Sequence, residues 1–225
     1  MKTYAIIPAG GKGVRSGFDA PKQYIKINKK ELIVYTLEVF QKNNLVDEVI
    51  VSAEPSYFPL LERLKKKYKL TKLRLPVEGG KERQDSVFNA LRSLKADKND
   101  IVIVHDAARP LLSPKVLTEA IVYAKKKGNA VVCVKAKDTL VKGGRKVESY
   151  LNRDEVFFVQ TPQIFKFGEL MQSMEKAYRE NFYGTDESML VQRTGRPVYI
   201  TEGSIINFKA TTKADIELLK TLLGK

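Results

Sequence analysis

Short apolar runs alternate with amphipathic stretches along most of the chain. Four of these runs, rich in β-branched residues, are residues 4–7, 49–51, 101–104 and 130–134. They are apolar at successive positions, which is typical of strands buried on both faces of a parallel sheet. We therefore predict four central strands in a sheet that helices cover.

Apolar residues spaced three and four apart lie between the predicted strands, as on amphipathic helices. They form three stripes: Leu60, Leu61, Leu64 and Tyr68; Val87, Ala90, Leu91 and Leu94; and Leu117, Ala120, Ile121 and Ala124. Ser113 before Pro114 is a helix start signal, and Thr212 with Asp215 opens a last helix. The alternation predicts an α/β fold with a doubly wound, mainly parallel, Rossmann-like sheet, in which ligands bind beyond the C-terminal ends of the strands.

One segment breaks this alternation. Residues 139–142 and 145–150 are strand-like and flank Gly143 and Gly144, which is a hairpin signal. We expect a β-hairpin arm at about residues 137–159 that protrudes from the sheet. Because a two-stranded ribbon is only marginally stable alone, the arm should pack on something, and a second subunit is a plausible candidate.

Composition narrows the class of protein. The chain of 225 residues is 43% apolar and 29% charged, which is typical of a globular protein and excludes a mostly disordered one. No apolar run approaches the ~18 residues that a membrane helix needs. The N-terminal residues show no long signal-type core, so we expect a cytoplasmic protein that does not enter a membrane. Cys133, the single cysteine, lies in an apolar run and should be part of the core.

The charge is unusual, because 40 Lys and Arg minus 26 Asp and Glu gives +14. This excess allows three interpretations: a nucleic-acid binder, an enzyme with polyanionic substrates, or a lysine-rich surface. Residues 65–67 and 125–127 are lysines placed between the apolar positions of predicted helices, so they indicate a solvated face. No helix-turn-helix, zinc-finger or aromatic-basic RNA signature supports nucleic-acid binding.

A glycine-rich loop follows the first predicted strand. Residues 8–17 (PAGGKGVRSG) contain four glycines, and Lys12, Arg15 and Lys22 crowd the same region. Backbone N–H groups of such a loop can surround phosphate oxygens, and the cations suit the charge that develops when a phosphate is attacked. Neither the P-loop nor the dinucleotide fingerprint fits the spacing. The alternative is a tight strand-to-helix turn with solvated lysines.

Two more clusters follow predicted strands or precede predicted helices. Residues 79–87 (GGKERQDSV) place a glycine pair before a helix, where Ser86 could hydrogen-bond a base edge, although an ordinary helix start explains the pattern equally well. In residues 104–110 (VHDAARP), Asp106 ends a central strand and is a suitable oxygen ligand for Mg²⁺. His105 is the only histidine, so a metal cluster or triad based on histidines is excluded, and we expect it to be structural.

These clusters together resemble the 2-C-methyl-D-erythritol 4-phosphate cytidylyltransferase family, the CTP-dependent enzymes of non-mevalonate isoprenoid synthesis. The matching segments are residues 8–15, 21–24, 79–87, 104–110, 138–139, Arg153, 161–163, 185–187 and 207–211. The likeness covers nearly the whole chain, and the ordered set of motifs is specific although no single motif is. It implies that residues 1–225 form a single nucleotidyltransferase domain, whose β-arm serves dimerisation.

The resemblance also implies roles for individual residues. Arg15 and Lys22 match the pair that stabilises the transition state, and Asp106 matches the Mg²⁺ ligand. The implied nucleotide-binding residues are Ala9, Gly10, Gly11, Lys12, Gly13, Gly80, Arg83, Ser86 and Ala107; those implied to position the sugar phosphate are Arg153, Lys209, Arg109 and Thr139. Through a crossing arm, Thr139 and Arg153 would serve the neighbouring subunit of a homodimer. The implied substrates are CTP and a polyol phosphate.

Three alternatives stay open at this point. Ile206 stands where the family often has an acidic residue that can meet the sugar hydroxyls, so the acceptor could instead be ribitol 5-phosphate. A nucleotide-binding regulator without activity is a second alternative, which Arg15, Lys22 and Asp106 argue against, and a nucleic-acid binder is the remote third. For residues 185–187, a helix cap is the favoured interpretation over a role in the site.

Overall fold

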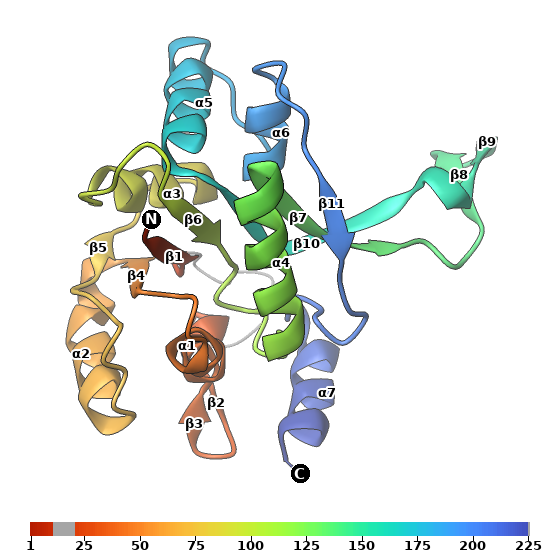
Figure 1. The fold of residues 1–225 in the computed structure, drawn as a ribbon. Coiled ribbons are helices and arrows are strands. Elements are labelled where there is room, and N and C mark those ends of the chain that lie inside the picture. The colour runs from red at the N-terminus through yellow and green to blue at the C-terminus, as the bar shows by residue number, and fades with distance from the viewer. Residues whose placement is uncertain (11–20, 225) are drawn as a thin grey trace.

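The computed structural model describes residues 1–10 and 21–224, and a seven-stranded sheet forms its centre (Figure 1). In spatial order the strands are β11 (Ile200–Glu202), β7 (Asn129–Lys135), β10 (Phe157–Lys166), β6 (Ile101–Val104), β1 (Thr3–Pro8), β4 (Glu48–Ala53) and β5 (Val77–Glu78). Neighbours pair in parallel except at β10, which is antiparallel to both β6 and β7. The predicted doubly wound, mainly parallel sheet is confirmed, and the four predicted strands are β1, β4, β6 and β7.

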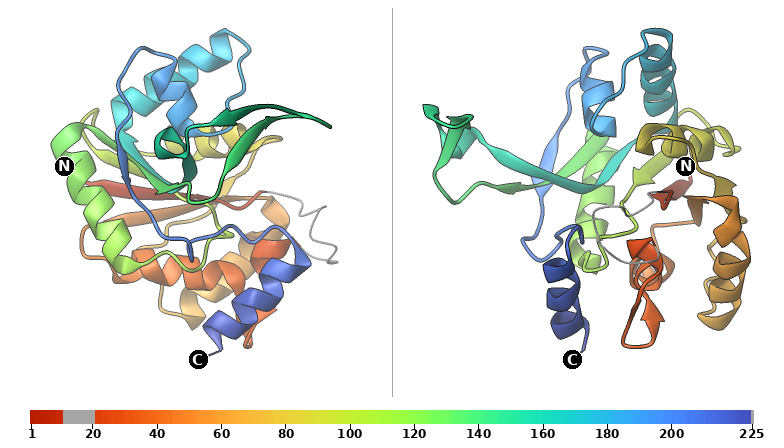
Figure 2. Two further views of the ribbon diagram at one scale, coloured as in Figure 1. Left: turned by 90° about the vertical axis from the view of Figure 1, so that its right-hand side faces the viewer. Right: turned by 180° about the vertical axis from the view of Figure 1, so that it is seen from behind.

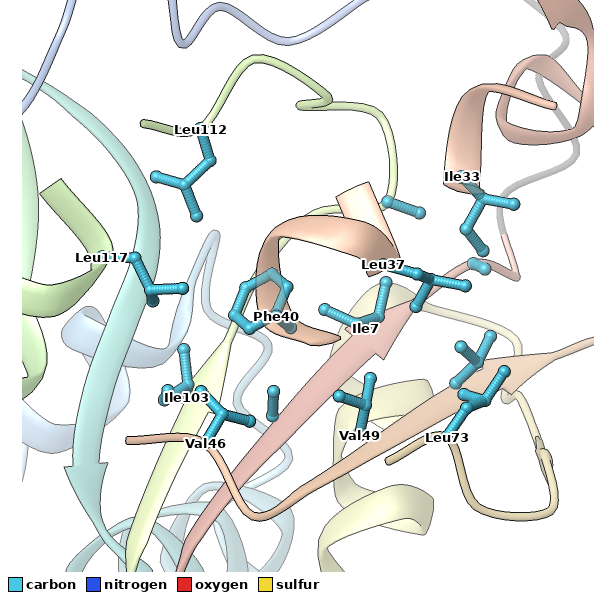
Figure 3. Close-up of a cluster of buried hydrophobic side chains, with 14 of the residues drawn as sticks. Ile7, Ile33, Leu37, Phe40, Val46, Val49, Leu73, Ile103, Leu112 and Leu117 are labelled. Atoms are coloured by element: carbon cyan, nitrogen blue, oxygen red, sulfur yellow. The ribbon is translucent and has the colours of Figure 1, made fainter. Parts of the chain in front are cut away.

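Helices cover both faces of the sheet. One face packs against α1 (Leu32–Lys42), α2 (Phe58–Lys67) and α4 (Pro114–Lys127), and the other against α3 (Arg83–Arg92), α5 (Phe167–Arg179) and α6 (Glu187–Gln192). Side chains of β1 alternate between the faces, so that Ile7 joins the first core and Ile6 the second. Figure 3 shows the first core, where Phe40 of α1 lies near Ile7 and Ile103. This alternation explains why the strands are apolar at successive positions.

The arm is shorter than predicted at its C-terminal end. Its hairpin consists of β8 (Leu140–Gly143) and β9 (Val147–Leu151), which form a separate two-stranded sheet standing away from the body (Figure 2). After η4 (Arg153–Glu155), residues 157–159 already pair with β7, so they belong to the central sheet rather than to a free arm. In the sequence, residues 156–159 continue the strand-like pattern of the arm, and only their pairing with β7 assigns residues 157–159 to β10.

The remaining elements are four short segments and the last helix. The short elements are η2 (Lys22–Tyr24), β2 (Lys26–Ile27), β3 (Lys30–Glu31) and η3 (Pro55–Tyr57). The last helix, α7 (Lys213–Leu223), packs on the β2–β3 hairpin through Ile216 and Leu219. Its predicted start is confirmed, because Thr212 Oγ1 accepts a hydrogen bond from the Asp215 N–H at 3.2 Å, and Asp215 Oδ2 accepts one from the Thr212 N–H at 2.8 Å. Across the described residues, every helix is too short or too polar to cross a membrane.

The strand order places two chain segments side by side. From β1 the chain proceeds to β4 and β5 on one side, and it then returns to β6 on the other side of β1. Ligands of doubly wound sheets bind at such a reversal, beyond the C-terminal ends of the strands. The segments that leave β1 and β6 at this edge are residues 9–10 and 105–109, which include Asp106.

Candidate active site

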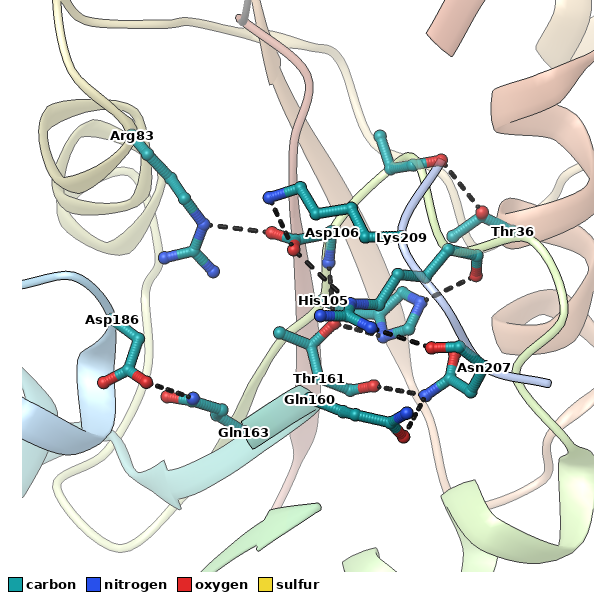
Figure 4. A network of polar contacts seen from close by, with 12 residues as sticks. Thr36, Arg83, His105, Asp106, Gln160, Thr161, Gln163, Asp186, Asn207 and Lys209 are labelled. Carbon is teal, nitrogen blue, oxygen red and sulfur yellow. Dashed lines mark hydrogen bonds and ion pairs between the residues drawn. The ribbon is translucent and has the colours of Figure 1, made fainter. Parts of the chain in front are cut away.

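Asp106 lies at the centre of a cluster of charged side chains (Figure 4). Its Oδ1 is 3.0 Å from Arg83 Nε, and its Oδ2 is 2.9 Å from Lys209 Nζ and 3.5 Å from Arg109 Nε. Burial would raise the pKa of Asp106, but Arg83, Lys209 and Arg109 hold that pKa well below its usual value. The carboxylate therefore stays ionised, which is the form in which a carboxylate binds a divalent cation.

Arg83 joins Asp106 to a second buried carboxylate. Its Nη1 donates a hydrogen bond to Glu187 Oε1 at 2.7 Å, while the side chain of Glu187 is only 2% exposed. The other oxygen of Glu187, Oε2, is buried and has no hydrogen-bond partner among the described residues. Arg83 is thus held from two sides, by Asp106 in the segment after β6 and by Glu187 at the start of α6.

His105 fastens the turn that carries Asp106 and Arg109. Thr161 Oγ1 accepts a hydrogen bond from the Asp106 N–H at 3.1 Å and lies 3.0 Å from His105 Nδ1. The Arg109 carbonyl, 3.1 Å from Nε2, can only accept, so a neutral ring that satisfies this contact carries its proton on Nε2. Nδ1 then accepts a hydrogen bond from the Thr161 hydroxyl. Burial lowers the pKa of His105 to about 4, so the ring is neutral at pH 7. The expectation that His105 is packed in the interior is confirmed.

The segment that carries Lys209 is tied to the same turn. The Ala210 N–H donates to the Ala108 carbonyl at 2.9 Å, and Arg109 Nη1 donates to the Asn207 carbonyl at 2.7 Å. On the opposite side, Thr36 of α1 donates its hydroxyl to the Ala107 carbonyl at 3.1 Å. The segment of residues 207–210, helix α1 and, through Thr161, strand β10 therefore hold residues 106–109 in place.

The described parts of the two glycine-rich segments meet at Ser86. A Cβ built on Gly10 or on Gly79 would lie 3.2 Å from Ser86 Oγ, and one on Gly80 would lie 2.1 Å from Asp85 Cβ, so only glycine fits at residue 80 without a shift. Ser86 Oγ accepts from the Gly80 N–H at 3.0 Å and donates to the Glu82 carbonyl at 3.1 Å. Its donor is thereby used within the protein, which leaves a lone pair to accept a hydrogen bond.

The other predicted site residues fall into four groups. Gly11, Lys12, Gly13 and Arg15 lie outside the described residues. Ala9 and Ala107 are buried, and their carbonyls accept hydrogen bonds from Gln23 and Thr36. Because alanine has no polar side-chain atom, only the backbone could bind a ligand at these positions. Lys22 is the first residue of η2. Thr139 and Arg153 lie exposed at the root of the arm, and among the described residues neither makes a hydrogen bond or ion pair with the Asp106 cluster.

Comparisons with known proteins identify the family. A family model described as 2-C-methyl-D-erythritol 4-phosphate cytidylyltransferase matches residues 3–225. The chain belongs to this family. Relatives with that name from Syntrophus aciditrophicus and Clostridioides difficile are 38% and 39% identical, the first over 100% of this chain and 97% of the relative, the second over 97% and 92%.

Solved structures of cytidylyltransferases share the fold. A 4-diphosphocytidyl-2C-methyl-D-erythritol synthase from Anaerococcus prevotii has a TM-score of 0.88 at 27% identity, covering 100% of this chain and 96% of that one. A 2-C-methyl-D-erythritol 4-phosphate cytidylyltransferase from Francisella tularensis has a TM-score of 0.84 at 31% identity, covering 98% and 99%. The resemblance inferred from the motifs is therefore confirmed over the whole chain.

Within this cytidylyltransferase fold, Asp106 fits the role of a Mg²⁺ ligand. It is an ionised carboxylate that already attracts three cationic groups. The described residues contain no group of three or more His, Cys, Asp or Glu side chains that could hold a metal. A Mg²⁺ ion here would therefore take its remaining ligands from water and substrate phosphates, as Mg²⁺ commonly does.

Some residues of this site could not be assigned from the sequence. Thr161 and Asn207 were part of matching motifs, but nothing in the pattern indicated that they contact His105 and Arg109. Asp186 does cap α6, accepting from the Met189 N–H at 2.9 Å, so the favoured interpretation of residues 185–187 is confirmed for Asp186. The cap does not account for Glu187, the next residue. Its side chain is buried and paired with Arg83, and the sequence pattern does not indicate this contact.

Proposed function

We propose that this protein transfers CMP from CTP to 2-C-methyl-D-erythritol 4-phosphate, giving 4-diphosphocytidyl-2-C-methyl-D-erythritol and pyrophosphate. The observation that carries this proposal is the family match over residues 3–225. The Asp106 cluster supports it, because three cations gather beyond the C-terminal ends of β1 and β6, where a polyanionic nucleotide is expected to bind. The chain is thus a nucleotidyltransferase of isoprenoid biosynthesis.

The reaction requires alignment and charge stabilisation rather than a general base. An oxygen of the acceptor's phosphate, already ionised at neutral pH, attacks the α-phosphorus of CTP. The bond from that phosphorus to the bridging oxygen of the β-phosphate breaks, and the electron pair leaves with pyrophosphate. Negative charge spreads over the oxygens of the α-phosphate in the transition state, so cations fixed beside it accelerate the step.

Residues of this chain divide these tasks. Arg15 and Lys22 are proposed to stabilise the charge at the α-phosphate, whereas Lys209 and Arg109, both within reach of Asp106, bind the phosphate of the acceptor. Mg²⁺ held by Asp106 would neutralise the triphosphate oxygens and ease the departure of pyrophosphate. Arg83 and the rest of the residues predicted to bind nucleotide would surround CTP, with Ser86 Oγ offering its free lone pair to the amino group of cytosine.

The arm is proposed to join two copies of the chain into a homodimer. Several large apolar side chains on and beside the arm are exposed, among them Val147, Tyr150 and Phe158, and Tyr150 is 73% exposed. A cavity of about 560 Å³ lies at the arm's root and is lined in part by Phe157, Ile200 and Ile205. Because contiguous exposed apolar surface marks interaction sites, this region suits a second copy whose Thr139 and Arg153 reach the neighbour's site. The single buried cysteine suits the reducing cytoplasm, where we place the enzyme.

Pyrophosphate release tests the proposed activity. Purified protein with CTP, Mg²⁺ and 2-C-methyl-D-erythritol 4-phosphate should give pyrophosphate and a new diphosphate diester in ³¹P NMR spectra, and protein without pyrophosphate release would contradict the proposal. Ribitol 5-phosphate serves as the matched acceptor control. We expect it to react poorly, because the family model and the relatives above carry the name of the erythritol substrate.

A further inference from the structure

Four residues form a ring of hydrogen bonds that shares Arg109 with the Asp106 cluster, and Figure 4 labels the other three, His105, Thr161 and Asn207. His105 Nε2 donates to the Arg109 carbonyl at 3.1 Å, and Arg109 Nη1 donates to the Asn207 carbonyl at 2.7 Å. Asn207 Nδ2 donates to the Thr161 carbonyl at 2.8 Å, and the Thr161 hydroxyl, 3.0 Å from His105 Nδ1, completes the ring. The ring thus joins the end of β6, the middle of β10 and the segment before α7.

Each member of the ring is next to a group of the proposed site. Asp106 follows His105 and donates its N–H to Thr161, while Lys209 is two positions beyond Asn207. Arg109 is itself a member. The ring therefore links the backbone segments that carry Asp106, Arg109 and Lys209, although Asp106 and Lys209 come from opposite halves of the chain.

The bonding pattern leaves little freedom for substitution. His105 and Asn207 are fully buried and Thr161 is nearly so, and a buried polar group that loses its partner is strongly unfavourable. β10 has an irregular register between Val159 and Gln163, which is where Thr161 lies. Such bulges re-aim side chains near active sites, and here the hydroxyl reaches both His105 and the Asp106 N–H.

We propose that His105 is a positioning residue, which acts through Thr161 and Arg109 to hold Asp106, Arg109 and Lys209 in the geometry for transfer to the α-phosphate. The proposal rests on the proposed cytidylyl transfer for its kinetic consequences. Its physical basis is that a reacting constellation displaced by about 1 Å can lose roughly 100-fold in rate. A merely packed histidine would carry no such consequence.

The tautomer of His105 tests the ring without any measurement of turnover. Because the chain has one histidine, untagged ¹⁵N-labelled protein gives a single imidazole spin system. We expect a neutral ring protonated at Nε2, with that proton protected from exchange and Nδ1 accepting a hydrogen bond. A ring protonated at Nδ1, or one whose Nε2 proton exchanges freely, overturns the proposal.

Two substitutions of His105 separate positioning from packing. His105→Phe keeps a ring in the space but removes both hydrogen bonds, whereas His105→Gln keeps an amide that can donate to the Arg109 carbonyl. We expect kcat of the Phe variant to fall roughly 10- to 100-fold, with KM for CTP little changed, and the Gln variant to recover much of the loss. If Phe supports turnover as well as Gln does, the histidine is only packed and the proposal fails.

A second pair of variants reaches the ring from Thr161. Thr161→Val should lower kcat and change the imidazole signal, and Thr161→Ser should restore both. Thr3→Val is the matched control. Thr3 is also buried, but it is the first residue of β1, at the end away from the candidate site, and its hydroxyl has no hydrogen-bond partner among the described residues. Equal losses in the two Val variants would overturn the proposal. A wild-type protein without turnover would contradict the proposed function instead, while the tautomer still decides the ring.

Discussion

Lys209 Nζ lies 2.9 Å from Asp106 Oδ2, although the two residues belong to opposite halves of the chain. The contact exists because the segment before α7 returns across the C-terminal end of β6 and is tied there by the Ala210–Ala108 backbone bond. Together with Arg83 and Arg109, Lys209 gives a single buried carboxylate three cationic neighbours. The cluster suits a site in which anionic phosphates and a divalent cation meet.

Replacing Asp106 by Asn should reduce turnover by roughly 100- to 1000-fold, because the proposed metal ligand loses its charge. Three cations would then face one another without their carboxylate. Pyrophosphate release at increasing Mg²⁺ measures the loss, and Mn²⁺ binding followed by electron paramagnetic resonance measures the site directly. Glu119→Gln removes the same charge from the exposed surface of α4 and should leave both unchanged. Full turnover in Asp106→Asn would refute the assigned role.

Glu187→Gln should destabilise the protein by roughly 1–3 kcal/mol, since Arg83 Nη1 loses its charged partner while Arg83 Nε stays paired with Asp106. Urea unfolding of this variant, of Arg83→Met and of the double variant forms a thermodynamic cycle. We expect the double variant to lose less than the sum of the two single losses, by on the order of 1–3 kcal/mol. Additive losses would mean that the 2.7 Å contact between Arg83 and Glu187 contributes no coupling.

Two inactive variants should complement each other if the arm serves the neighbouring subunit. Arg153→Ala would damage the partner's site, and Asp106→Asn would damage its own. In a mixed dimer one site then has both residues intact, so equal mixing after exchange of subunits should restore about a quarter of the wild-type rate, the statistical share of intact sites. Sedimentation velocity checks that dimers form. A mixture no more active than its components would place Arg153 outside the neighbour's site.

The thiol of Cys133 should resist alkylation at neutral pH. Burial raises its pKa to about 11, so the reactive thiolate is scarce at pH 7.5 and grows only as the pH approaches that value. Iodoacetamide treatment of the folded protein should leave its intact mass unchanged, whereas the same treatment in urea should add one group to the single cysteine. Rapid modification of the folded protein at pH 7.5 would contradict the shift.

Much of the fold could be predicted from local pattern. The apolar runs of β1, β4, β6 and β7 and the stripes on α2, α3 and α4 were recognised because burial on a sheet or helix leaves a period in the sequence. The sequence pattern does not predict the middle of β10, because its residues there are polar. Gln160, Thr161 and Gln163 are buried, and their side chains form hydrogen bonds with Ser204, His105 and Asp186. No local period encodes such partners.

In the candidate site, too, some residues were expected from the sequence and others were assigned only by the structure. Asp106 and Ser86 are candidates from the motifs themselves, whereas Arg83, Arg109 and Lys209 are implied by the family resemblance. The resemblance assigns Arg83 only to the nucleotide, and the sequence does not indicate its contact with Glu187. A buried ion pair between α3 and α6 depends on two helices packing against the same face of the sheet, which their separate sequences do not specify.

By itself, the sequence determined the fold class, which follows from periodicity. Its ordered motifs carry the resemblance to the family, and that resemblance implies most of the charged residues that the structure gathers around Asp106. Only the tertiary structure decided which side chains meet. The ring through His105, Thr161, Asn207 and Arg109, and the three cations around Asp106, bring together groups from segments far apart in the chain. Hydrogen bonds and ion pairs of that kind depend on distances that exist only after the sheet and its helices have packed.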